Sequence, residues 1–112
     1  EAETLYREAI DIRCKLAQKA PEAYEPRLAA SCNNLACLLR DQADLEAAEA
    51  LFREALSIRR KLAAQSPDVY KEALAWSCFH LSECLNDQGR IDEAEPLRRE
   101  SMEIYRELND EA

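Results

Sequence analysis

The feature that most constrains the fold is a repetition at a fixed spacing. Residues 2–17 read AETLYREAIDIRCKLA, and residues 48–63 read AEALFREALSIRRKLA. When the chain is shifted by 46 residues, residues 2–46 match residues 48–92 at 21 of 45 positions. A third version begins at Ala94 as AEPLRRESMEIYREL. Such repetition indicates a stack of similar units, each of which buries its apolar side against its neighbours.

Within one unit the apolar residues recur at helical spacing. Steps of three or four residues place them on one stripe of a helix. In the middle copy this stripe comprises Leu45, Ala48, Leu51, Ala55, Ile58 and Leu62. The chain has only one Gly and four Pro, which favours long helices with short connections. We therefore predict an all-α fold with five helices, over about residues 2–20, 25–41, 45–65, 69–87 and 91–108. Stacked as antiparallel hairpins with a 46-residue period, they form an α-solenoid.

The connections carry helix-ending signals. The sequence DQAD at residues 41–44 corresponds to DQGR at residues 87–90. Gly89 can adopt the left-handed conformation that ends a helix, and Ala43 stands at the equivalent position. If both turns need a positive φ there, Ala43 carries about 1–2 kcal/mol of strain. Asp44 is a candidate N-cap, and Ser66 followed by Pro67 is typical of a helix start.

The length of 112 residues suits a single repeat domain, residues 1–112. It divides into a partial repeat at 2–20 and two repeats at 25–65 and 69–108. The first helix lacks a preceding partner, although Leu5, Tyr6, Ile10 and Leu16 give it an apolar face. We therefore expect either a fragment of a longer array or a face that a second copy covers.

Charge and cysteine content narrow the function classes. A net charge of -8 disfavours binding to nucleic acid and to anionic membranes. The chain shows no membrane-spanning run and no signal-peptide pattern. Its five cysteines form no CxxC motif, which favours reduced thiols and a cytoplasmic location. His80 is the only histidine, so no His-based metal site is expected, and a solvated or hydrogen-bonded side chain is the simplest interpretation. We predict no catalytic residue, metal or cofactor.

At this level of detail the chain resembles the tetratricopeptide repeat. The first helix of a unit supplies Cys32, Leu35-Ala36 and Leu39, and the second supplies Ala48, Phe52 and Ala55. The next copy supplies Cys78, Leu81-Ser82, Leu85, Ala94 and Ser101, and the opening helix supplies Ala2, Tyr6 and Ala9. The standard repeat has 34 residues, so 46 is a departure. The phrases NNLACLL, AEALFREALSIR and EAEPL resemble the longer repeats of kinesin light chains and related bacterial proteins.

The resemblance implies a protein partner, bound as a peptide or helix in the groove lined by the first helices. Transferred by position, the groove residues are Asn33, Cys37, Arg40, Trp76, Phe79, Glu83 and Asn86, with Ala30, Asp41 and Asp87 beside them. Asn33 and Asn34 match the paired asparagines of the kinesin-light-chain type. Because Arg40 is the only base in this set, no clamp for a C-terminal carboxylate is expected.

Alternatives to peptide binding by these residues remain. Trp76 and Phe79 lie off the apolar stripe, where aromatic residues either anchor a partner or pack against a neighbouring repeat. A structural protein that self-associates through its unpaired first helix is the second functional hypothesis. An enzyme is the third, and it would depend on a reactive thiol at Cys37, although no neighbouring group obviously lowers the pKa of that thiol.

Overall fold

The computed structural model describes residues 2–111, together with the side chains of residues 3–110. Glu1 and Ala112, the ends of the expected domain, lie outside this range, as does the side chain of Ala2. The described residues form five helices and no strand: α1 Ala2–Lys19, α2 Pro21–Asp41, α3 Leu45–Gln65, α4 Pro67–Asp87 and α5 Ile91–Glu111. The prediction of an all-α chain is confirmed.

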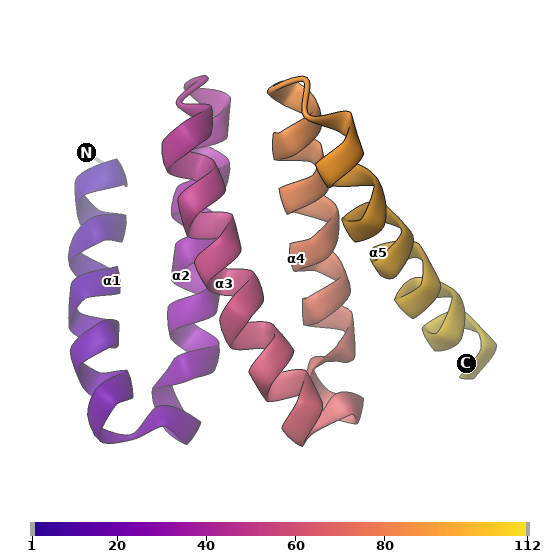
Figure 1. Cartoon of the computed structure of the whole chain (residues 1–112). Coiled ribbons are helices and arrows are strands. Elements are labelled where there is room, and N and C mark those ends of the chain that lie inside the picture. Colours follow the sequence, from indigo (N-terminus) through magenta and orange to yellow (C-terminus); the bar gives the residue numbers. More distant parts are fainter. Residues whose placement is uncertain (1, 112) are drawn as a thin grey trace.

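Consecutive helices run antiparallel and pack side by side (Figure 1). α2 pairs with α3 and α4 pairs with α5, and α3 and α4 join the two hairpins. The starts of α2 and α4 are 46 residues apart, as are the starts of α3 and α5. Each hairpin leaves apolar side chains on its flank that the next hairpin buries. The α-solenoid with a 46-residue period is therefore confirmed.

The expected start of α2 was wrong, because the helix begins at Pro21 rather than at about residue 25. α4 begins at Pro67, two residues before the expected limit, and the helix start expected from Ser66 and Pro67 is confirmed. Proline suits the first helical position because its missing N–H would have no partner there. α1 ends at Lys19 and α5 continues to Glu111, each close to the expected limit. Both helices of a unit consequently have 21 residues, so the first helix is not the shorter one.

The two turns within the hairpins adopt the same backbone conformation. Ala43 has a φ of 64° and Gly89 has a φ of 78°, which confirms the left-handed position expected from the sequence. The N–H of Asp44 donates to the carbonyl of Leu39 at 2.8 Å, and the N–H of Arg90 donates to that of Leu85 at 2.9 Å. Asp44 occupies the N-cap position of α3, but its side chain makes no capping hydrogen bond.

The core consists of equivalent residues from both units. Cys32 and Cys78 are fully buried, and Ala48 and Ala94 are at most 1% exposed. Alanine at these places lets neighbouring helices approach closely, because a longer side chain would require the hairpin to open. Small buried residues therefore set the spacing of the helices that carry the surface described below.

The first helix is covered on part of its apolar face. Ile10 belongs to the buried core and Tyr6 packs against it, whereas Leu5 is 65% exposed. Leu16 is half-buried. The expectation that all four residues form an unpartnered face was therefore too broad, because α2 already covers the side that includes Ile10.

Candidate functional site

The face shared by α2 and α4 contains a pocket with a volume of about 370 Å³. Helices α2 and α4 supply most of its wall, and α3 and α5 each contribute one side chain. The lining residues are Ala30, Asn33, Asn34, Arg59, Val69, Glu72, Ala73, Trp76 and Tyr105. We refer to this pocket and the adjoining surface of α2 and α4, up to Arg40, Glu83 and Asp87, as the α2–α4 groove.

A network of hydrogen bonds holds the side chain of Asn33, which lies at the back of the pocket. Asn33 is only 2% exposed, and its Nδ2 donates to the Oγ of Ser77 at 3.4 Å. Arg59 donates from Nη1 to the same Oγ at 3.0 Å and to the carbonyl of Ala73 at 3.3 Å. The Oδ1 of Asn33 is buried and has no hydrogen-bond partner among the described residues. Unpaired buried acceptors are uncommon in folded proteins.

Aromatic residues form a cluster along α4. The ring centroids of Trp76 and His80 lie 3.7 Å apart, and Phe79 meets His80 edge-on at 5.3 Å. The guanidinium of Arg59 lies 5.8 Å from the centroid of the Trp76 ring. The sequence left open whether Trp76 anchors a partner or packs within the repeats. Its side chain packs on His80 and also lines the pocket, so the two roles are compatible.

The expectation for His80 was wrong. Its Nδ1 is buried and has no hydrogen-bond partner, and the ring lies between those of Trp76 and Phe52. Burial lowers the pKa of His80 below its usual value, so the imidazole is neutral at pH 7. The His80 ring therefore packs against other aromatic rings, whereas the sequence suggested that it is solvated or hydrogen-bonded.

An ion-pair network links α2 to α4 at the other end of the groove. Arg40 donates from Nε to Asp87 at 2.6 Å and from Nη1 to Glu83 at 3.3 Å. The hydrogen bond to Asp87 contributes most to raising the pKa of Arg40. One guanidinium thus faces two carboxylates, and the end of the groove retains a negative charge.

The cysteines show no sign of an activated nucleophile. All five are free thiols. Burial, followed by the negative charge of Asp41, raises the pKa of Cys37, and burial raises the pKa of Cys32 and Cys78 to about 12. A thiol with a raised pKa is a poor nucleophile at neutral pH. In the described part of the chain, no group of three or more His, Cys, Asp or Glu side chains could hold a metal ion.

The structure brings together only part of the set proposed from the sequence. Asn33 and Trp76 line the pocket, and Arg40 and Glu83 form the ion pair. The other three lie outside the pocket: Cys37 is half-buried, Phe79 packs on His80, and Asn86 is exposed. The sequence argument missed Arg59 and Ser77. Their signal was the repetition itself, since Arg13 and Ser31 form the same hydrogen-bonded pair 46 residues earlier.

Comparison with known families agrees with this architecture. The tetratricopeptide repeat family model matches residues 28–68 and again residues 74–111. The two matches begin 46 residues apart and cover most of the chain. The chain belongs to the tetratricopeptide repeat family. No curated protein matches it.

Tetratricopeptide repeats mediate interactions between proteins and form a scaffold family without catalytic function. The matched residues include most of both hairpins, although Val69, Glu72 and Ala73 of the pocket lie between the two matches. None of the helices described here is both long and apolar enough to span a membrane.

Proposed function

We propose that this chain is a non-enzymatic scaffold that holds an extended peptide segment of a partner protein in the α2–α4 groove. The unpaired Oδ1 of Asn33 is the observation that carries the proposal. A buried polar group without a partner costs about 1–3 kcal/mol. This oxygen has almost no exposed area, so a main-chain N–H of an extended peptide would reach it once the Asn33 side chain turns toward the pocket, and binding would thereby recover the cost.

The surroundings of Asn33 support a peptide as the occupant. Ala30, Ala73 and the ring of Trp76 provide an apolar wall, whereas Asn34 and Arg59 add polar groups. Alternation of apolar and polar contacts fits an extended chain, whose successive side chains point to opposite sides. Ser77, which also accepts a hydrogen bond from Arg59, holds the Nδ2 of Asn33 beside the pocket.

A displayed library of random dodecapeptides, selected on the immobilised protein, tests this proposal. Selected peptides without tryptophan are titrated while the fluorescence of Trp76, the sole tryptophan, is recorded. Calorimetry then compares the wild type with the Asn33→Ala, Trp76→Ala double variant, in which we expect at least about a tenfold loss of affinity. Met102→Ala is the matched control, because this exposed apolar residue lies outside the pocket. If the double variant binds as the wild type does, the groove is not the binding site.

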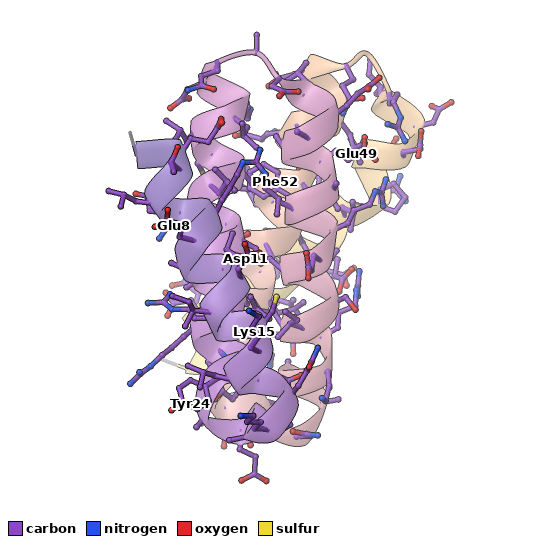
Figure 2. The ribbon with its side chains drawn as sticks, turned by 90° about the vertical axis from the view of Figure 1, so that its left-hand side faces the viewer. Glu8, Asp11, Lys15, Tyr24, Glu49 and Phe52 are labelled. Atoms are coloured by element: carbon purple, nitrogen blue, oxygen red, sulfur yellow. The ribbon has the colours of Figure 1, made fainter. Side chains whose placement is uncertain are left out.

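Self-association is the second candidate function, and exposed apolar residues on α1 motivate it. Leu5 is 65% and Ile12 is 59% exposed. Viewed from the α1 side, however, Glu8, Asp11 and Lys15 lie along the outer surface of this helix (Figure 2). A charged outer surface opposes a close apolar stack, which makes the groove the better supported site. Sedimentation equilibrium at high protein concentration tests the alternative, and a monomer under these conditions contradicts it.

A further inference from the structure

The charge of the α2–α4 groove constrains the class of segment that it can hold. The two helices that form the groove carry seven acidic and three basic residues, but not all of them face it. Glu25, for example, is paired with Lys61 of α3. At the end of the groove that holds Arg40, the charged side chains are Arg40, Asp41, Glu83 and Asp87, so three carboxylates accompany one guanidinium.

The groove is also richer in acceptors than in donors. Asn33 is 2% exposed, and its Oδ1 has no hydrogen-bond partner among the described residues. Glu83 and Asp87 each use a single oxygen in their bonds to Arg40. A ligand that donates hydrogen bonds and carries positive charge would match these groups, and Lys and Arg side chains do both.

The positions of the charges indicate at which end of the groove a cationic side chain would bind. Arg59 lies at the pocket end beside Trp76, so its guanidinium repels a cation there. Asp41 and Asp87 are the last residues of α2 and α4, where the helix dipole adds negative potential. Asn33 and Arg40 are two helical turns apart, which is about 10 Å. An extended peptide covers this distance in about three residues.

We propose that the segment bound in the α2–α4 groove is cationic, with Lys or Arg about three residues away from the main-chain N–H that reaches Asn33. This inference rests on the proposed peptide-binding function. The cation lies against Glu83 and Asp87, next to the place that Arg40 already occupies. The rest of the segment is apolar or neutral, because it lies beside Arg59 and Trp76.

Three N-acetylated, C-amidated nonapeptides provide the test. They share a Leu-Gln-Ala centre and carry lysine, serine or glutamate at one position, three residues C-terminal to the glutamine. A second set carries the same residues three positions N-terminal to the glutamine, because a peptide can lie in the groove in either direction. We expect the lysine peptide to bind at least about tenfold more tightly than the serine peptide, and the glutamate peptide to bind most weakly. Added salt should reduce the advantage of lysine, because the carboxylates at this end of the groove are partly exposed.

Variants of the acidic end identify where the lysine binds. The Glu83→Gln, Asp87→Asn double variant should lose the preference for lysine and retain its affinity for the serine peptide. The Glu8→Gln, Asp11→Asn variant makes the same change of charge on the outer surface of α1 and should keep the preference. Circular dichroism tests whether both variants fold.

The possible failures are distinguishable. If all three peptides bind equally and Asn33→Ala weakens each of them, the groove binds peptides but the cationic preference is wrong. If the glutamate peptide binds best, the preference is also wrong. If Asn33→Ala leaves the binding of every peptide unchanged, or if no peptide binds in either assay, the proposed function fails as well.

Discussion

Helices α3 and α5 are equivalent elements of successive repeats, but only α3 is covered on both sides. Phe52 of α3 is fully buried, whereas the equivalent residue of α5 is Arg98, which is exposed. Leu56 is 7% exposed, and its counterpart Met102 is 54% exposed. Helix α4 packs on this side of α3, and no described helix packs on the same side of α5.

The difference shows that repetition specifies the backbone more strictly than the side chains. Glu25 and Lys61 form an ion pair at 2.9 Å, and the equivalent pair in the next repeat is Lys71 and Glu107, also at 2.9 Å. The two charges have exchanged places between α2–α3 and α4–α5. The contact between helices is therefore retained even where neither residue is, because its energy depends on opposite charges and not on which helix carries them.

The largest loss of stability should come from substituting Phe52, the fully buried residue of the Phe52 and Arg98 pair. Phe52→Ala leaves a cavity between α3 and α4 and should lower the free energy of unfolding by about 3–5 kcal/mol. Arg98→Ala at the equivalent position should change it by less than about 0.5 kcal/mol, because the side chain is exposed. Urea denaturation of both variants measures the difference. Similar losses in the two variants would mean that α5 is covered as α3 is.

A slightly smaller loss is expected where two helices approach closely. Ala48→Leu overpacks a position that is 0% exposed and should cost about 1–3 kcal/mol. Ala50→Leu adds the same atoms to an exposed position of α3 and serves as the matched control. Thermal melting compares the two. An unchanged melting temperature for Ala48→Leu would remove the argument that small residues set the helix spacing.

Substitutions in the two turns should each change the free energy of unfolding by about 1 kcal/mol. Ala43→Gly relieves the strain of a positive φ and should stabilise the fold by up to about 1 kcal/mol, after the greater flexibility of unfolded glycine is subtracted. Gly89→Ala should destabilise it by about the same amount, since a Cβ there meets no neighbouring atom and only backbone strain remains. Chemical denaturation of each variant gives the sign. Equal signs for the two substitutions would contradict the equivalence of the turns.

The smallest expected effect concerns a missing ion pair. Arg60 forms two hydrogen bonds with Glu100, at 2.7 and 2.9 Å, between α3 and α5. The equivalent residues on α1 and α3 are Cys14 and Glu54, and the charge of Glu54 contributes to the raised pKa of Cys14, after burial. Cys14→Arg should restore the pair and add about 0.5 kcal/mol of stability at low salt. Adding Glu54→Gln to this variant should abolish the gain, as should high salt.

The candidate site was predictable where it depended on position within a repeat. Asn33 and Trp76 follow from the family pattern, and both line the pocket. The role of Arg59 was not predictable in this way, because a charged residue beside the apolar stripe of a helix usually remains in solvent. Its contacts with Ser77 and Trp76 depend on how α3 lies against α4. The burial of His80 depends in the same manner on Phe52, which belongs to another helix.

The sequence by itself determined the helices, their repetition and the two turns, including the positive φ at Ala43. The helices and turns depend on residues three to five positions apart, and the repetition depends on similar residues 46 positions apart, so both can be read along the chain. Only the tertiary structure decided which polar atoms lack a partner and which charges meet across the groove. Asn33 and Ser77 are separated by 44 residues, and Arg40 and Asp87 by 47. At such separations a contact depends on the packing of whole helices, which a local pattern does not contain.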